Sequence, residues 1–302
     1  MKKISRIGMV GLGTMGKLLS TRLLRAGYDV VGYDIAPTRV EIPEFVKHFK
    51  QVISFEEMIK NNVDIIWLML PAGEAVDVIV GQVIALGLHN TIIIDGGNSH
   101  YKDSIRRYEY LQKQRIQFVD CGVSGGQLGC EEGFSLMVGG QLDSFTYCLP
   151  IFAALAAQDG YVYCGPSGAG HYVKMVHNGI EYALLQAYGE GFDILRNGYY
   201  NNLDIAHISD AWMHGALIRS YLLSLISQEL NKDQYLISVS GKVGQHGTGK
   251  WTVEEAQERH IAASLIAQAV KIREDSLKTG GSFATKLIAL MRHVFGGHAF
   301  FN

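Results

Sequence analysis

The first 164 residues alternate short apolar runs with segments of helical periodicity. The apolar runs have the length of strands, and several are apolar almost throughout, as strands covered on both faces are. They are Ser5–Val10, Asp29–Tyr33, Ile65–Leu70, Thr91–Ile94, Gln117–Asp120, Ser135–Val138 and Tyr161–Tyr163. Helical patterns fall between most of them, notably at Gly16–Arg25, Glu74–Ala85 and Lys102–Lys113. This alternation predicts a parallel, doubly wound α/β sheet.

The pattern changes after the turn-forming sequence Gly165-Pro166-Ser167-Gly168. Beyond it nearly every segment has helical periodicity, and the predicted helices are His171–Gly189, Asp204–His214, Ile218–Gln228, Val253–Leu277 and Phe283–His293. A chain of 302 residues is long enough for two domains. We therefore predict an α/β domain over residues 1–165 and an all-α domain over residues 166–302.

Composition excludes several classes of protein. Hydrophobic residues make up 48% of the chain and charged residues 19%, so a disordered chain is excluded. The formal net charge of −2 lacks the basic excess of a nucleic-acid binder. The longest apolar run, Ile65–Pro71, is far shorter than the roughly 18–20 residues of a membrane helix. The four cysteines (Cys121, Cys130, Cys148 and Cys164) and the eleven histidines show no metal-ligand spacing, so we expect a cytoplasmic protein with reduced thiols and no metal.

A glycine-rich turn joins the first predicted strand to the first predicted helix. It reads Gly11-Leu12-Gly13-Thr14-Met15-Gly16, the G-x-G-x-x-G pattern of a dinucleotide-binding Rossmann domain. Asp34, 23 positions after Gly11, ends the second predicted strand, where an acidic residue accepts hydrogen bonds from the adenosine ribose. Its charge would repel a 2′-phosphate by up to about 4 kcal/mol at about 4 Å. The pattern favours NAD, with NADP the alternative because Arg39 lies nearby in the sequence.

A second group of polar residues shares one face of a predicted helix. Lys174, His177, Asn178 and Glu181 follow the spacing i, i+3, i+4 and i+7. Lys174 and Glu181 are then about 10 Å apart along the helix axis, which leaves room for a small linear substrate. The alternative is a polar stripe on a solvated helix. The helix directly follows the nucleotide domain, and the poor helix formers Asn178 and Gly179 have no surface rationale, so we favour a catalytic face.

The chain resembles the short form of the decarboxylating 6-phosphogluconate dehydrogenases, within the β-hydroxyacid dehydrogenase group. The motifs that carry the resemblance are Gly11–Gly16, Asp95-Gly96-Gly97-Asn98-Ser99, Gly122-Val123-Ser124-Gly125-Gly126, Lys174–Tyr182, Gly247–Thr252 and Phe295-Gly296-Gly297-His298. They extend over nearly the whole chain in the family's order. Simpler members of the group, such as 3-hydroxyisobutyrate dehydrogenase, share the Gly165–Asn178 pattern but are not expected to carry Asp95–Ser99, the Glu181-Tyr182 pair or the tail with His298.

The resemblance implies a reaction of the pentose phosphate pathway and gluconate metabolism, in which 6-phosphogluconate is oxidised and decarboxylated to ribulose 5-phosphate. Neutral Lys174 would take the proton of the C3 hydroxyl, which requires desolvation because a lysine pKa is ordinarily about 10.4. Glu181 would protonate C1 of the enediol, and His177, Asn178 and Asn98 would orient hydroxyl groups. Ser124, Gly125 and Gly126 would bind the carboxylate. The implied cofactor contacts are Gly11–Gly16, Asp34, Leu70, Pro71, Ala72 and Asn98.

The resemblance also implies a phosphate site in the helical domain and tail. Its candidates are Tyr182, His246, Thr248, Arg273, Arg292 and His298. At the position of His246 long-form enzymes usually carry a lysine, so a non-phosphorylated sugar acid is a second candidate substrate. The helical domain is also much shorter here than in the long forms. We expect a homodimer or a higher homo-oligomer. Two alternatives stay open: a β-hydroxyacid dehydrogenase acting on 3-hydroxyisobutyrate or gluconate, and a catalytically silent dinucleotide-sensing protein.

Overall fold

The computed structural model of the chain describes residues 3–36, 40, 42–200, 202–244 and 247–301. The chain divides into two compact units, Met1–Met175 and Val176–Asn302. The division falls inside one long helix, α7 (Ala169–Asn197). None of the helices in the described ranges is long and apolar enough to cross a membrane.

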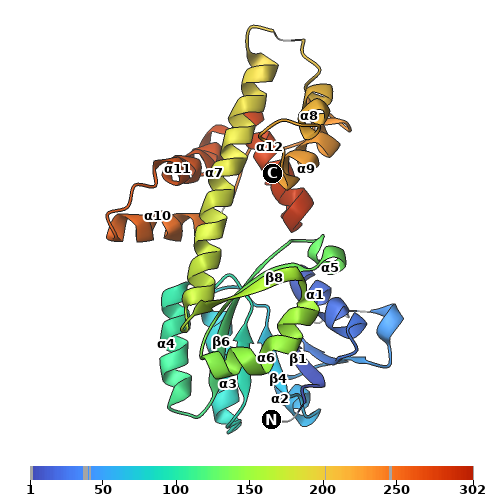
Figure 1. Ribbon diagram of the computed structural model, residues 1–302, viewed down its shortest axis with the longest axis vertical. Coiled ribbons are helices and arrows are strands. Elements are labelled where there is room, and N and C mark those ends of the chain that lie inside the picture. Colours follow the sequence, from blue (N-terminus) through green and yellow to red (C-terminus); the bar gives the residue numbers. More distant parts are fainter. Residues whose placement is uncertain (1–2, 37–39, 41, 201, 245–246, 302) are drawn as a thin grey trace. The chain divides into compact units, whose positions relative to one another are not determined.

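The first unit is built on one twisted sheet. Among the described residues it has eight strands in the order β3-β2-β1-β4-β5-β6-β7-β8 (Figure 1). They are β1 (Arg6–Val10), β2 (Asp29–Tyr33), β3 (Phe49–Val52), β4 (Ile65–Leu68), β5 (Ile92–Asp95), β6 (Gln117–Ser124), β7 (Phe134–Gly139) and β8 (Ala156–Gly165). All neighbouring pairs in this order are parallel except β6 and β7, which are antiparallel. The prediction of a doubly wound sheet is confirmed, with this one antiparallel pair as a correction.

Helices cover both faces of the sheet, as the apolar strands require. In β4, Ile65 and Trp67 pack with helices α1 (Thr14–Arg25) and α6 (Leu142–Leu155), whereas Ile66 and Leu68 pack with α2 (Phe55–Lys60), α3 (Glu74–Ala85) and α4 (Tyr101–Gln112). Successive side chains of a strand point to opposite faces, so a strand buried on both sides is apolar throughout. Two short helices, η1 (Pro43–Phe45) and α5 (Gly129–Glu132), complete the unit.

The order of the strands reverses beside β1. The chain runs outward from β1 through β2 to β3, then returns to place β4 on the other side of β1 and continues outward through β5 and β6. In doubly wound sheets the ligand binds outside the carboxyl ends of the strands at such a reversal. The register at these ends pairs Leu68 with Asp95 and Asp95 with Asp120.

The second unit is helical throughout its regular structure, which confirms the predicted all-α domain. After α7 it contains α8 (Ile205–Met213), α9 (Tyr221–Leu230), α10 (Thr248–Glu258), α11 (Ser264–Thr279) and α12 (Phe283–Gly296). The main core joins α7, α8, α9 and α12, and includes Phe192, Ile205, Ile226 and Met291. A smaller cluster joins α7 to α11 through Tyr182, Ala269 and Val270.

The prediction of a single helix over Val253–Leu277 is wrong. Helix α10 ends at Glu258 and α11 begins at Ser264. His260 has a φ of 56°, in the left-handed region, and the Ile261 N–H donates to the Ala256 carbonyl over 2.8 Å. A left-handed residue followed by this backbone bond is the usual end of a helix, but it ordinarily falls on glycine or asparagine. The segment has neither, so its sequence carried no stop signal.

Candidate active site

The glycine-rich turn lies at the carboxyl end of β1. Gly11 has a φ of +93°, and a Cβ there would lie 2.3 Å from the Met69 carbonyl oxygen, so only glycine fits. A Cβ on Gly16 would lie 1.9 Å from the Gly11 carbonyl oxygen, which shows how closely α1 packs on the turn. In contrast, a Cβ on Gly13 would meet nothing within 4 Å, and this residue is exposed. The turn therefore leaves open space in front of the helix.

The start of helix α1 has no anionic or side-chain partner of its own. Gly13 provides no side-chain cap, and the first turn contains no acidic residue. The first backbone N–H groups of a helix lack intrahelical acceptors and carry the positive end of the helix dipole. A pyrophosphate would satisfy these groups, so Gly13, Thr14, Met15 and Gly16 fit a dinucleotide.

Asp34 is bound to the same turn. One carboxylate oxygen accepts a hydrogen bond from the Leu12 N–H over 2.6 Å, and the other accepts one from the Ala36 N–H over 2.8 Å. A carboxylate has about four acceptor positions, so both oxygens keep capacity for ribose hydroxyls. Asp34 is half-buried beside the exposed Ile35. Arg39, which could favour a 2′-phosphate, lies outside the described residues.

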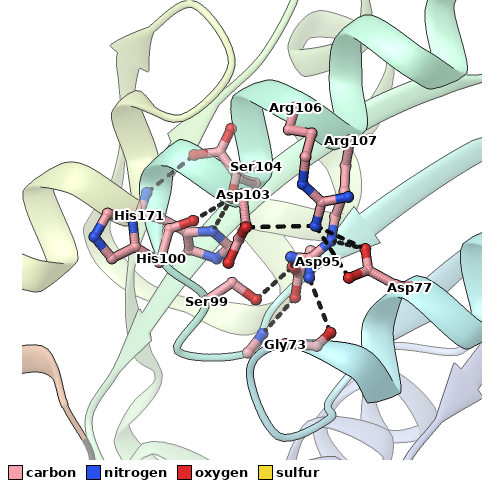
Figure 2. Close-up of polar contacts among 12 residues, drawn as sticks. Gly73, Asp77, Asp95, Ser99, His100, Asp103, Ser104, Arg106, Arg107 and His171 are labelled. Atoms are coloured by element: carbon pink, nitrogen blue, oxygen red, sulfur yellow. Dashed lines mark hydrogen bonds and ion pairs between the residues drawn. The ribbon is translucent and has the colours of Figure 1, made fainter.

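The loops that follow β4 and β5 carry the remaining cofactor candidates. Leu70 is half-buried, whereas Pro71, Ala72 and Asn98 are exposed. Asp95, fully buried at the end of β5, accepts hydrogen bonds from the Gly97 N–H over 3.1 Å and from Ser99 Oγ over 2.7 Å (Figure 2). The carboxylate thus shapes the loop from inside, and the motif Asp95–Ser99 presents Asn98 at its tip.

Lys174 lies in the first turns of α7, close against β6. A Cβ on Gly122 would lie 2.3 Å from Lys174 Cβ, so the missing side chain makes room for the lysine. Only 7% of Lys174 is exposed. The next residues of the motif, Gly125 and Gly126, have φ values of 130° and 54° and lie in the turn after Ser124. Their backbone N–H groups are therefore in a turn that L-residues rarely adopt.

A buried carboxylate fixes the start of α7. Asp120 accepts hydrogen bonds from the Gly168 N–H over 2.6 Å and from the His171 N–H over 2.9 Å, and its side chain is fully buried. His171 Nδ1 also shares a 2.7 Å hydrogen bond with Ser104 Oγ of α4 (Figure 2). Since a negative group is favourable at a helix N-terminus, Asp120 both caps and orients the helix that carries Lys174.

In the second unit, α7 meets the start of α10. Asn178 Nδ2 donates to Thr248 Oγ1 over 3.3 Å, and Asn178 Oδ1 lies 3.1 Å from His177 Nδ1. Asn178 is 9% exposed and Thr248 is 4% exposed. The structure thus brings together three of the residues predicted for the substrate site. Glu181, one helical turn further on, is half-buried.

A buried arginine lies over the ring of Tyr182. The guanidinium carbon of Arg273 is 3.3 Å from the ring centroid, and the residue is only 1% exposed. Within the described part of the chain, none of its three guanidinium nitrogens has a hydrogen-bond partner. The pKa of Arg273 is lowered to about 10, chiefly because burial disfavours the charged form. The charge of Arg292 also lowers it, whereas Tyr182 and Glu181 raise it. Burial also lowers the pKa of Arg292.

These two cations are a candidate anion site, in which Arg273 has no hydrogen-bonded acceptor among the described residues and the charge of Glu181 acts on both guanidinium groups. Buried charged groups are ordinarily paired, because an unpaired one costs several kcal/mol. Arginine suits phosphate, since its planar guanidinium can donate two parallel hydrogen bonds. Of the other phosphate candidates, His298 is half-buried and its carbonyl oxygen lies 2.9 Å from His293 Nδ1. His246 lies outside the described residues.

Two models of known protein families together match almost the whole chain. The family model of the NAD-binding domain of 6-phosphogluconate dehydrogenase matches residues 6–165. The model of the C-terminal domain of 6-phosphogluconate dehydrogenase matches residues 170–286. The chain belongs to the 6-phosphogluconate dehydrogenase family.

Relatives in this family include enzymes of the same length and longer ones. The NAD(+)-dependent, decarboxylating 6-phosphogluconate dehydrogenase of Haloferax volcanii is 40% identical over 297 residues, which cover 97% of each chain. The solved structure of 6-phosphogluconate dehydrogenase from Plasmodium falciparum, studied with its cofactor NADP+ and its substrate 6-phosphogluconate, superposes with a TM-score of 0.81 at 32% identity. That match covers 91% of this chain and 62% of the other.

A solved 3-hydroxyisobutyrate dehydrogenase from Mycobacterium tuberculosis has the same fold. Its TM-score is 0.74 at 22% identity, and the match covers 95% of this chain and 99% of the other. At this identity the likeness concerns the fold alone.

Two residues that shape the candidate site were not predicted from the sequence. Asp120 of β6 and Arg107 of α4 are buried charged residues whose partners are distant in the chain. Asp120 could have been found from one signal, an acidic residue at the end of an apolar strand, which Asp95 shows as well. Nothing local identified Arg107, because its helix reads as an ordinary charged one.

Proposed function

We propose that this protein oxidises and decarboxylates 6-phosphogluconate to ribulose 5-phosphate and CO2 with NAD as the hydride acceptor. The observation that carries the proposal is the pair Arg273 and Arg292. One of these buried guanidinium groups has three unpartnered nitrogens, and a phosphate would satisfy them. A substrate without a phosphate would leave these hydrogen-bond donors unsatisfied.

The residues of the first unit suit NAD. The open, uncapped start of α1 would take the pyrophosphate, and Asp34 would hold the adenosine ribose and repel a 2′-phosphate. When bound, NAD supplies an acceptor for the hydride that leaves C3 of the sugar acid. The exposed Pro71, Ala72 and Asn98 would contact the cofactor from the loops after β4 and β5.

Lys174 would act as the base and then as the acid at C3. Its neutral Nζ takes the proton of the C3 hydroxyl as the hydride leaves, and the burial of the side chain is the desolvation that such a base needs. The product is a β-keto acid, which loses CO2 readily. The protonated Nζ then donates a hydrogen bond to the ketone oxygen while the enediol forms.

Glu181 would complete the reaction by protonating C1 of the enediol. It follows Lys174 by seven residues on α7, which corresponds to two turns and about 10 Å along the axis. A separation of this size leaves room for a small linear sugar acid between the two side chains. His177, Asn178 and Asn98 would orient hydroxyls, and Ser124, Gly125 and Gly126 would hold the carboxylate with hydroxyl and N–H donors.

The proposal is tested with a matrix of substrates and cofactors. The purified protein is given NAD or NADP with 6-phosphogluconate, gluconate or 3-hydroxyisobutyrate, while reduced cofactor and CO2 are followed together. We expect one CO2 for each NADH with 6-phosphogluconate and a preference for NAD. Oxidation without CO2, or faster turnover of gluconate or 3-hydroxyisobutyrate, would instead indicate a β-hydroxyacid dehydrogenase. Tight NAD binding without turnover of any substrate would indicate a dinucleotide sensor.

We also propose that the chain forms a homodimer or higher homo-oligomer in the cytoplasm. Helix α7 exposes Ile180, Leu184, Ala187, Gly191 and Ile194, whose spacing alternates between four and three residues. Ile180 is 52% exposed, Leu184 48% and Ile194 70%. An apolar stripe with this period is typical of a helix that packs along another helix. Fractionation of cells that express the protein tests the proposed location. Recovery of the protein outside the cytoplasmic fraction would contradict it.

A further inference from the structure

Arg107 is a buried cation with three partners on two different segments. It lies on α4 and is 1% exposed. Its Nε donates to Asp77 Oδ1 over 2.8 Å, and its Nη2 donates to the Gly73 carbonyl oxygen over 2.9 Å. Its Nη1 lies 3.6 Å from Asp95 Oδ2, at ion-pair distance (Figure 2). A guanidinium is rarely buried unless it organises several acceptors in this way.

The segments that Arg107 joins are the loops after two neighbouring strands. Gly73 ends the loop after β4, and Asp77 lies in the first turn of the helix that follows it, α3. Asp95 ends β5 and shapes the next loop through the Gly97 N–H and Ser99 Oγ. The tips of both loops, Pro71-Ala72 and Asn98, are exposed. Arg107 therefore holds the bases of two loops whose tips face solvent.

The strand order assigns these loops to one half of a dinucleotide. The strand order reverses between β1 and β4. Asp34 at the end of β2 and the glycine turn after β1 serve the adenosine and the pyrophosphate. A dinucleotide extends across the reversal, so its second nucleoside lies over the carboxyl ends of β4 and β5. The loops fixed by Arg107 are on that second side.

We propose that Arg107 is a positioning residue for the nicotinamide half of the NAD site. The guanidinium does not reach the cofactor itself, and it acts by fixing the two loops that carry Pro71, Ala72 and Asn98. The inference rests on the proposed NAD site but not on the identity of the sugar acid. A change at Arg107 should therefore weaken the binding of the nicotinamide half of NAD and leave the binding of the adenosine half unchanged.

The neighbouring Arg106 offers a matched control. It is on the same helix and pairs with the same carboxylate, at 3.0 Å from Asp77 Oδ2, and with Asp103 at 3.4 Å. Its side chain is 57% exposed, so it approaches Asp77 from the solvent side. Although burial alone would raise the pKa of Asp77, the hydrogen bonds from Arg107 and Arg106 hold it below its ordinary value.

The test compares NADH with ADP-ribose, which lacks the nicotinamide. Both are titrated by calorimetry into the full-length wild type, Arg107→Lys and Arg106→Lys. Lysine keeps the charge but cannot donate to Asp77 and to the Gly73 carbonyl in the two fixed directions of the guanidinium. For Arg107→Lys we expect the Kd of NADH to rise about 10-fold, because the loops lose their common anchor, and the Kd of ADP-ribose to stay within about 2-fold. Arg106→Lys should leave both within about 2-fold.

Other outcomes would overturn the inference. Equal losses of both ligands in Arg107→Lys would show that Arg107 only stabilises the fold, and an unchanged Kd of NADH would show that it does not position the loops. If Arg107→Lys does not fold, Asp77→Asn gives the second test, since it weakens the same anchor and should show the same selective loss of NADH affinity. An Asp77→Asn chain that binds both ligands like the wild type would equally overturn the inference. A wild type that binds neither ligand would overturn the NAD site itself, whereas failure to turn over 6-phosphogluconate would leave these titrations unaffected.

Discussion

Arg273 is a residue whose burial lowers the free energy of unfolding. Its pKa of about 10 lies below the ordinary value of an arginine, because burial disfavours the charged form. The unfolded chain therefore binds this proton more tightly than the folded chain does. The free energy of unfolding falls as the pH drops from the ordinary pKa of an arginine through about 10, and the whole penalty is present at neutral pH. A phosphate bound beside the guanidinium would remove part of it.

Replacement of Arg273 should therefore separate stability from substrate binding. Arg273→Met keeps the stem and removes the buried charge, so we expect an equal or higher Tm without ligand. The KM for 6-phosphogluconate should rise roughly 10–100-fold, because a charged hydrogen bond is worth about 1.5–3 kcal/mol. Thermal unfolding and steady-state kinetics check both effects. Arg25→Met, in an ion pair with Glu131 in which both side chains are more than a third exposed, is the control and should change neither appreciably. A lower Tm with an unchanged KM would contradict the anion site.

At this scale, short-range patterns were predictable and long-range partners were not. Gly11–Gly16 and Asp34 could be proposed because the spacing of a turn and the next strand end is fixed by the strand–helix–strand unit. Asp120 and Gly168 are 48 positions apart, and Arg107 and Asp77 are 30 apart. Such pairs become neighbours only through the order of strands in the sheet. A single sequence does not contain that order in any local pattern.

Helix α7 is the element on which most of the proposed chemistry depends. Asp120 fixes its first turn, Lys174 and Glu181 follow on one face, and an exposed apolar stripe runs along its second half. None of the stripe residues is among those assigned to the substrate, so a change in the stripe leaves every assigned side chain in place. This separation allows the proposed assembly to be tested by itself.

A charge in the stripe should dissociate the proposed oligomer. The wild type, with a chain mass of 33.3 kDa, should sediment as a dimer or a larger assembly, and Leu184→Glu should sediment as a monomer because a buried carboxylate at a helix–helix contact is unpaired. Leu265→Glu on α11 replaces another exposed leucine, 76% exposed, and should leave the assembly unchanged. A monomeric wild type, or a Leu184→Glu chain of unchanged mass, would show that α7 is not the interface.

Elements with clear periodicity and ordinary ends were predictable. The predicted range Glu74–Ala85 is the range of α3, where apolar residues recur on one face. The predicted helix over Val253–Leu277 fails because the break at His260 depends on a left-handed residue that has no glycine or asparagine to mark it. Strand β3 was not predicted either, since Phe49–Val52 is only four residues long, has Lys50 and Gln51 between its two apolar residues, and owes its pairing to β2.

For the whole molecule, the proposed chemistry is divided between two units that share one helix. Lys174 lies in the unit that carries the glycine turn, and Glu181 lies in the unit that carries Arg273. The fold of each unit was predictable from periodicity, and the family resemblance from motifs along the whole chain. The anion site was predictable only as separate residues, because the stacking of Arg273 on Tyr182 arises from the packing of α11 against α7.

The most direct test of this account is a single-turnover experiment on Lys174 and Glu181. Excess enzyme is mixed with 6-phosphogluconate and NAD, and NADH, CO2 and ribulose 5-phosphate are measured with time in the wild type, Lys174→Met, Glu181→Gln and the surface control Lys113→Met. Lys174→Met should form neither NADH nor CO2, whereas Glu181→Gln should form both and release ribulose 5-phosphate about 100-fold more slowly, as expected for a lost general acid. A Lys174→Met chain that reduces NAD at the wild-type rate, or a Glu181→Gln chain that makes ribulose 5-phosphate as fast as Lys113→Met, would contradict the account.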